Sequence, residues 1–235
     1  MSNSIELLLN KIDENDVDAV NNIILTGIDL NSYNSDGVTP LHHAIKKGHL
    51  NICKALFLGG ADIEHLHDYG ESFNKAPLFV AIEHGKWPIC GTLISAGTNV
   101  NIIDSLGQTP LMWAAAKNKE IFTEKLIKAG AKINAKDKSG KTAMHYASMN
   151  YEGMELIKLL LEAGADINFT DNKGHTPLHD AACHGIETLS FRFLKKHGAN
   201  FGKSNPPKMQ NIRFKQCPNC ANSIPEDMYD THHCV

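Results

Sequence analysis

A block of about 33 residues recurs along most of this chain, and this recurrence restricts the fold more than any other feature. Five segments align on a shared anchor, which is Thr39 in DGVTPLHHA, Ala76 in NKAPLFVA, Thr109 in LGQTPLMWAAA, Thr142 in SGKTAMHYA and Thr176 in KGHTPLHDAA. The anchors are 37, 33, 33 and 34 residues apart. A period of this length is typical of solenoid proteins, whose units each contact only their sequence neighbours.

Each unit is predicted to contain two short helices. A threonine–proline pair favours a helix start, because the hydroxyl accepts a hydrogen bond from a free N–H and proline in the first turn loses none. About twenty-one residues after each anchor, a glycine signature such as AGAD at 163–166 ends a second apolar segment. Glycine tolerates the left-handed conformation that ends many helices, and the following DxxG stretch favours a turn. The expected unit is therefore helix, turn, helix and a hairpin-like loop.

With these motifs the sequence resembles the ankyrin repeat family, whose signature is T-P-L-H-x-A. The resemblance covers roughly residues 3 to 202, and the opening unit lacks T-P-L-H, as expected of a capping repeat. It implies an all-α solenoid of about six helix-turn-helix units with hairpin loops. Its inner helices and loops would form a concave surface that binds another macromolecule, usually a protein. We therefore expect a non-enzymatic protein–protein interaction adaptor.

The repeat pattern and the composition of the tail predict three regions. They are a repeat domain over 1–202, with a capping unit at 1–33 and units at about 34–66, 67–101, 102–134, 135–168 and 169–202, then a linker over 203–216 and a zinc-binding tail over 217–235.

Candidate partner-binding residues lie in one long loop and along the inner helices. The loop over 65–77 is about four residues longer than its counterparts and carries His67, Tyr69 and Phe73, although a tolerated surface insertion is the alternative. The resemblance assigns variable inner-helix positions to Lys46, Lys47, His84, Lys117 and Met149, and positions often used for binding to His184 and its neighbour Cys183. Trp113 and Tyr146 follow the fourth signature position in neighbouring units, where packing between repeats accounts for them equally well.

Other residues that could carry chemistry have structural explanations. The resemblance gives His42, His145 and His179 the role of hydrogen-bonding neighbouring backbone. Cys53 and Cys90 fall in the apolar stripe of the second helices and are expected to be buried. The loop asparagines Asn101, Asn134 and Asn168 are expected to bond the backbone of their own turns. No Gly-rich phosphate loop, G-x-S-x-G or H-E-x-x-H motif is present, so the sequence does not predict an enzyme.

The last nineteen residues hold three of the six cysteines. Cys217-Pro-Asn-Cys220 has the spacing of a zinc knuckle, and eleven residues separate Cys220 from His232. A helix over 223–233, with Ser223 as its cap, would return the second pair of ligands. The predicted set is Cys217, Cys220, either His232 or His233, and Cys234, around a structural Zn²⁺ that supplies the folding free energy of the tail.

The tail also resembles the ubiquitin-binding zinc fingers of DNA-repair proteins, which carry C-P-x-C, then I-P, then H-x3-C. Here one residue, not three, separates His232 from Cys234. Ubiquitin is thus an alternative partner. A nucleic-acid-binding finger is a further alternative, disfavoured by the acidic tail helix.

Charge and hydropathy exclude some partners and locations. The formal net charge is −3, so neither nucleic acid nor an anionic membrane is a default partner. No positively charged signal region and no stretch of eighteen apolar residues is present. We expect a cytoplasmic or nuclear protein, where reducing conditions favour metal binding by cysteines over disulfides.

Overall fold

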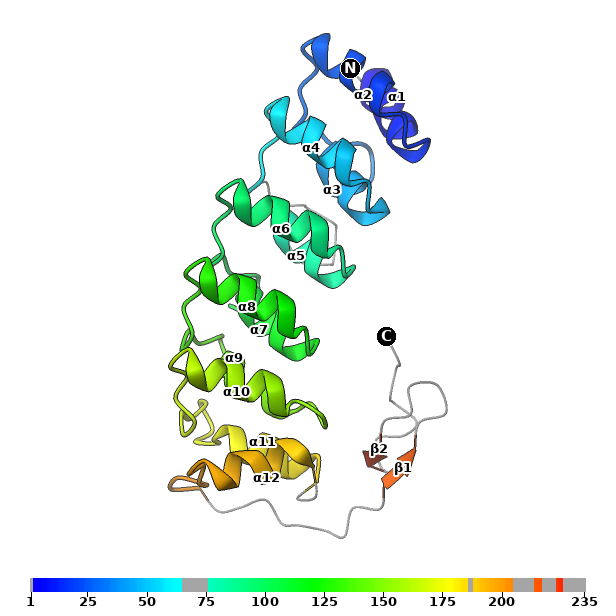
Figure 1. Cartoon of the computed structure of the whole chain (residues 1–235). Coiled ribbons are helices and arrows are strands. Elements are labelled where there is room, and N and C mark those ends of the chain that lie inside the picture. Colours follow the sequence, from blue (N-terminus) through cyan, green and yellow to red (C-terminus); the bar gives the residue numbers. More distant parts are fainter. Residues whose placement is uncertain (1, 65–75, 186–187, 205–213, 217–222, 226–235) are drawn as a thin grey trace. The chain divides into compact units, whose positions relative to one another are not determined.

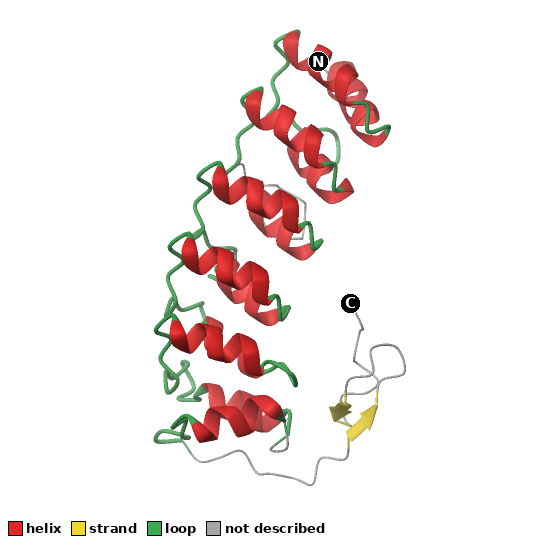
Figure 2. Ribbon diagram, in the orientation of Figure 1, coloured by secondary structure: helices red, strands yellow, loops and turns green. Residues whose placement is uncertain are grey.

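In the computed structural model, residues 2–64, 76–185, 188–204, 214–216 and 223–225 are described. The chain forms two compact units, 1–110 and 111–235, and the helices come in pairs (Figure 2). The helices of the first unit are α1 (Ser2–Asp13), α2 (Val17–Leu25), α3 (Pro40–Lys47), α4 (Leu50–Leu58), α5 (Pro77–Glu83) and α6 (Trp87–Ser95). Helix α7 (Pro110–Ala116) begins at the boundary and is followed by α8 (Glu120–Lys128), α9 (Ala143–Ser148), α10 (Met154–Glu162), α11 (Pro177–Cys183) and α12 (Leu189–Lys196).

The first helix of each pair lies in one layer and the second helix in another, as Figure 1 shows for each unit. In the first unit, α1, α3 and α5 contact one another in sequence, and so do α2, α4 and α6. In the second unit, α9 packs on α11, while α8, α10 and α12 form the other row. We call the first helices inner and the second helices outer. This arrangement is the stack of helix-turn-helix units expected from the repeat.

Helix starts follow the capping chemistry read from the motif. Proline opens α3, α5 and α11, and α7 begins at Pro110. The Thr39 hydroxyl accepts from the backbone N–H of His42, and Thr142 and Thr176 form capping boxes with the histidines three residues later. The residue before α5 is Ala76, whose side chain cannot cap the helix. Its backbone is nevertheless extended, as at the threonines that precede the other inner helices.

The loops close as the DxxG pattern predicts. The backbone N–H of Asp137 donates to the carbonyl of Lys141 at 3.0 Å, and the Asp137 carboxylate accepts from the backbone N–H groups of Ser139 and Lys141. The outer helix before this loop, α8, ends at Lys128 and is followed closely by Gly130, which has a φ of +87°. A side chain is strained in that conformation, so glycine is favoured there.

The helices from α3 to α12 each bury a side chain at an equivalent position of the repeat. The inner helices bury the residue after the first proline or alanine, and the outer helices bury a leucine in their second turn. These buried residues are Leu41, Leu78, Leu111, Met144 and Leu178 from the inner helices, and Leu56, Leu93, Leu126, Leu160 and Leu194 from the outer helices. None of the helices in the described residues is long and apolar enough to cross a bilayer.

Two short strands lie beyond the repeats. Strand β1 (Phe214–Gln216) pairs antiparallel with β2 (Ser223–Pro225), and Gln216 lies opposite Ser223. The expectation of an all-α chain therefore holds for the repeat region and is corrected in the tail. The predicted linker ends in a strand, and the helix predicted over 223–233 is wrong at its start, because residues 223–225 find their backbone partners in β1. Ile224 is β-branched and Pro225 is tolerated at a sheet edge, which favours this outcome.

Candidate functional site

In the first unit, the predicted partner-binding residues lie at the ends of two inner helices. Lys46 and Lys47 are exposed in the last turn of α3, and His84 is exposed at the end of α5. The ammonium of Lys47 is 2.6 Å from the carboxylate of Asp13 at the end of α1, and His43 Nε2 lies 2.9 Å from the same oxygen. Lys47 thus bridges two inner helices, while Lys46 points its charge to solvent.

In the second unit, the predicted residues lie within or just after α7, α9 and α11. Lys117 is exposed, and Trp113, Tyr146, Met149 and His184 are each partly exposed. The structure therefore presents an aromatic, a thioether, an imidazole and a cation on the inner-helix side of this unit. Side chains of this range suit a mixed polar and apolar protein surface.

Tyr146 also has a structural contact that the sequence did not reveal. Its hydroxyl donates to Asp137 Oδ2 at 2.6 Å, joining α9 to the loop that precedes it. Burial alone would raise the pKa of Asp137, but hydrogen bonds from Tyr146, Ser139 and Lys141 hold that pKa below its ordinary value. Tyr146 is thus a packing residue as well as a candidate contact.

A second polar contact joins a loop to the next inner helix. Lys141 Nζ lies 2.8 Å from Asp180 Oδ1, and the two side chains are only 21% and 12% exposed. Burial lowers the pKa of His184, one turn after Asp180, although the carboxylate of Asp180 opposes the shift. Burial and then Asp180 raise the pKa of Cys183, which disfavours its reactive thiolate. His184 and Cys183 therefore both favour their neutral forms, which suits them to contacts with a partner and not to nucleophilic chemistry.

The signature histidines hold the helices and loops together, as the resemblance implies. His145 Nδ1 accepts from the backbone N–H of Thr142 at 3.1 Å, and its Nε2 lies 3.2 Å from the carbonyl of His175 in the next repeat. His42 and His179 bond the threonines that precede their helices. Each ring is buried, so these imidazoles serve the fold.

Asn134 and Asn168 correct the expectation that the loop asparagines bond their own turns. Asn134 Oδ1 accepts from the backbone N–H of Asp166 and its Nδ2 donates to the carbonyl of Gly164, both at 3.0 Å. Asn168 makes the same pair of contacts to Asn200 and Gly198. These side chains bond the next repeat, not their own turns, because Asp166 already accepts from the backbone N–H of Asn168.

Similar bridges occur in the first unit, one from an asparagine and one from a glutamate. Asn31 Oδ1 accepts from the backbone N–H of Asp62 at 2.8 Å. One repeat later, Glu64 Oε1 accepts from the Thr98 hydroxyl at 2.6 Å and from the backbone N–H of Asn99 at 2.7 Å. The recurrence of asparagine near the loop tips could have predicted these contacts between repeats in the sequence. Glu64 has no such recurrence, so its contact could not have been predicted.

The other sequence predictions concern cysteines and segments beyond the described part. Cys53 and Cys90 are buried as expected, and burial raises the pKa of Cys53 to about 12. The loop residues His67, Tyr69 and Phe73 lie outside the described residues, as do the predicted zinc ligands Cys217, Cys220, His232, His233 and Cys234. Among the residues that the structure does describe, no group of three His, Cys, Asp or Glu side chains could hold a metal ion.

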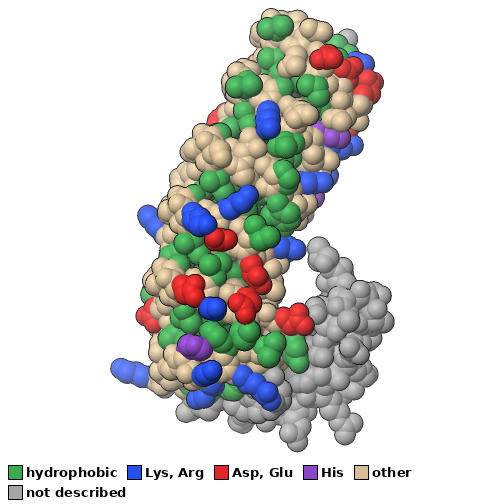
Figure 3. Space-filling model, in the orientation of Figure 1, with side chains coloured by type: hydrophobic (Ala, Val, Ile, Leu, Met, Phe, Trp, Pro, Cys, Tyr) green, Lys and Arg blue, Asp and Glu red, His purple; other side chains and the backbone are tan. Residues whose placement is uncertain are grey.

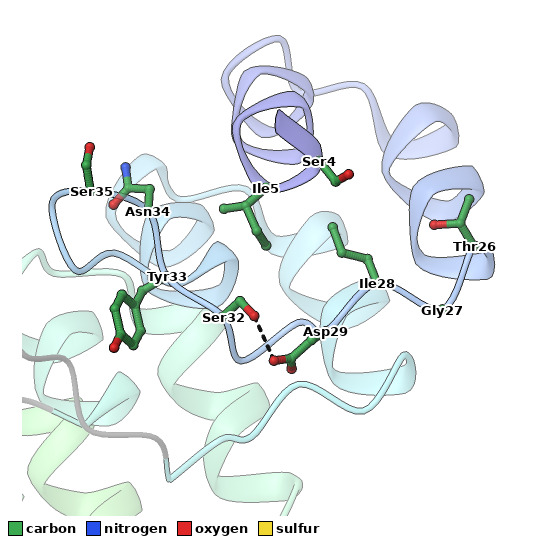
Figure 4. Close-up of a pocket in the computed structure, with 10 residues that line it drawn as sticks. All are labelled: Ser4, Ile5, Thr26, Gly27, Ile28, Asp29, Ser32, Tyr33, Asn34 and Ser35. Atoms are coloured by element: carbon green, nitrogen blue, oxygen red, sulfur yellow. Dashed lines mark hydrogen bonds between the residues drawn. The ribbon is translucent and has the colours of Figure 1, made fainter. Parts of the chain in front are cut away.

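A hollow of about 550 Å³ lies between the start of α1 and the loop that follows α2 (Figure 4). Ile5 and Ile28 point toward one another across it, and hydroxyl groups including those of Ser4 and Ser32 surround them. The carboxylate of Asp29 accepts from the Ser32 hydroxyl at 2.7 Å and from the backbone N–H of Asn31. The lining contains no histidine or cysteine, and its polar groups are mainly hydroxyls and the Asp29 carboxylate, so it offers a mixed polar and apolar surface for contact.

Comparisons with known proteins agree with this geometry. The family model of ankyrin repeats in three copies matches the chain in overlapping windows, at residues 7–104, 56–137, 78–171 and 122–205. A chain of the solved complex between the predatory endopeptidase Bd0816 of Bdellovibrio bacteriovorus and the immunity protein Bd3460 is similar in fold. It aligns with a TM-score of 0.70 and 28% identity over 81% of this chain and 97% of that chain.

A curated relative is similar over a shorter stretch. The Danio rerio protein named "Putative palmitoyltransferase ZDHHC13" is 43% identical over 91 residues, which is 39% of this chain. The match spans only 13% of the length of that protein.

Proposed function

Because the chain belongs to the ankyrin-repeat family, we propose that it is a non-enzymatic adaptor that holds a protein partner on its inner-helix faces and loops. The observation that carries the proposal is the set of accessible side chains at equivalent ends of successive inner helices. They include Lys46, His84, Lys117, Met149 and His184, which lie at two adjacent positions of the repeat and comprise cationic, imidazole and thioether side chains. A structural neighbour taken from a complex of two proteins supports a protein partner. The palmitoyltransferase similarity covers too little of that protein to extend an activity to this chain.

Affinity capture with charge-reversed variants tests the adaptor function. Lys46→Glu combined with Lys117→Glu changes two exposed lysines at inner-helix ends, and a partner bound there should be lost from the captured fraction. Lys54→Glu is the control, because this exposed lysine lies on the outer helix α4. Equal recovery of every captured protein by all variants would contradict binding at the inner-helix ends.

We infer a second function for the tail, a structural zinc site that orders a small module after the repeats. The register of β1 and β2 supports it, because residues 217–222, which contain Cys217 and Cys220, connect two strands that pair side by side. Bound zinc would fix the two thiolates together with His232 or His233 and Cys234, and a closed set of four leaves no position for catalysis.

Metal analysis of the full chain, purified under reducing conditions without chelator, tests this site. We expect about one zinc per chain, as for a single closed tetrahedral site. Cys217→Ser combined with Cys220→Ser should abolish the zinc, whereas Cys183→Ser, which changes an exposed cysteine of the repeats, should retain it. Titration of labelled ubiquitin with the same protein then separates a ubiquitin-binding finger from a purely structural one.

A further inference from the structure

A groove separates the two outer helices α8 and α10 of the second unit. It has a volume of about 250 Å³ and is lined by Glu120, Ile121 and Glu124 from α8 and by residues of α10 between Glu155 and Glu162. Figure 3 shows acidic side chains gathered around hydrophobic ones over these helices. The groove belongs to the outer layer, so it is separate from the inner-helix ends considered above.

The groove carries an excess of negative charge. Its lining contains four glutamates and one lysine, Lys158. Glu124 is paired with Lys128, one turn further along α8. Within the described residues no ion pair neutralises Glu120, Glu155 or Glu162. Three carboxylates therefore face solvent around the groove against the single charge of Lys158.

The groove is also lined by two apolar side chains, Ile121 and Leu159. Ile121 is 75% exposed, although it lies next to the buried Phe122 on the same helix. Leu159 contributes from α10 and is partly exposed, whereas the neighbouring Leu160 is fully buried. Ile121 and Leu159 are thus surplus to the core, and covering them would remove apolar surface from water.

We propose that this groove binds a basic amphipathic helix of a partner protein. Glu155 and Glu162 are seven residues apart, so they lie two helical turns or about 10 Å apart along α10. Lysine or arginine side chains at one- and two-turn spacing on a partner helix match these carboxylates. Large apolar side chains on the same helix reach Ile121 and Leu159. The charge excludes acidic segments, and the inner-helix ends stay open for another partner.

Fluorescence anisotropy on the full chain tests the proposal with a synthetic probe. The probe is a labelled helix of about eighteen residues with leucines every third or fourth position and flanking lysines. A peptide of the same composition in scrambled order has the same charge but no apolar face. We expect the ordered helix to bind and the scrambled peptide to bind at least about fivefold more weakly, because only the ordered helix brings an apolar face to Ile121 and Leu159.

Single substitutions locate the binding site. Glu155→Gln and Ile121→Ser should each weaken binding on the order of 3- to 10-fold, the range expected for one partly screened ion pair or one apolar contact. Glu6→Gln removes the same charge from an exposed position on α1 and should leave the affinity unchanged. The proposal is overturned if the scrambled peptide binds equally well, if Glu6→Gln weakens binding as much as Glu155→Gln, or if no binding is detected at about 1 mM.

Discussion

The imidazole of His145 is buried, and each of its nitrogens has a hydrogen-bond partner. Its Nδ1 accepts the backbone N–H of Thr142, so Nε2 must carry the hydrogen that points to the carbonyl of His175. Burial lowers the pKa of this histidine, and the carbonyl of His175 and the carboxylate of Asp180 only partly oppose the shift. A proton added at Nδ1 would face the N–H of Thr142, which is a donor. A signature residue of the repeat thus makes folding sensitive to acid.

We predict that the free energy of unfolding falls as the pH drops below about 6.5, the unfolded pKa of histidine, towards the lower folded pKa of His145. The sign follows because the unfolded chain binds a proton in this window more readily than the folded chain does. His145→Gln removes this contribution, so its stability should approach that of the wild type as the pH falls. Urea unfolding at several pH values measures the difference, and parallel curves would contradict the prediction.

Two glycines with similar backbone conformations differ in what surrounds them. Gly140 has a φ of +82°, and an added Cβ would lie 2.7 Å from the backbone nitrogen of Asn172 in the next repeat. Gly164 has a φ of +90°, and nothing lies within 4 Å of an added Cβ. We expect Gly164→Ala to cost about 1 kcal/mol for the left-handed backbone alone. Gly140→Ala should cost roughly 2–4 kcal/mol, because Asn172 must also move. Chemical unfolding measures both changes in the free energy of unfolding. Equal changes would show that Asn172 moves away from the added Cβ at no cost.

At the scale of elements, side chains in the loops join one repeat to the next. In the second unit Asn134 and Asn168 bond the backbone of the following repeat, and the ion pair between Lys141 and Asp180 links a loop to the next inner helix. These contacts complement the apolar packing between helices, because they satisfy loop backbone groups that no helix or sheet pairs.

We predict that Asn134→Ala lowers the free energy of unfolding by about 1–2 kcal/mol, since it removes two hydrogen bonds at once. The backbone N–H of Asp166 loses its acceptor and should exchange with deuterium faster in the variant. Asn22→Ala is the matched control on an exposed face of α2 and should change stability by less than about 0.5 kcal/mol. Unchanged exchange at Asp166 would show that the bridge contributes nothing.

The elements that the sequence predicted well are those whose causes are local. A threonine, a proline and a histidine within four residues start α3 and α11, and a glycine ends the helix before each loop, so a single segment contains the information. The contacts of Asn134 could not be read in this way, because its partners lie 30 and 32 residues ahead and depend on stacking. The tail strands were missed for the same reason, since three residues form a strand only when a partner strand satisfies their backbone.

At the scale of the whole molecule, the chain combines a helical repeat region with a short paired-strand segment. The last described contacts of the repeats are made by Ser204, whose hydroxyl donates to the carbonyl of Gly174 at 2.7 Å. Among the described residues, the buried side chains named for the core lie in the helical repeats. We therefore expect the helical region to fold on this packing without the tail.

A chain shortened to residues 1–204 should keep the melting temperature of the full chain within about 3 °C. A chelator added to the full-length protein should likewise leave the helical transition in place, because no group of three potential ligands occurs among the described residues.

Residues 1–168 provide the contrast. This fragment lacks α11 and α12, which pack on α9 and α10, and would expose an apolar repeat surface to water. We expect its melting temperature to fall by about 10 °C or more, as loss of several kcal/mol implies. Circular dichroism at 222 nm follows all three chains, and a drop in residues 1–204 as large as that in residues 1–168 would mean that the tail is part of the folding unit.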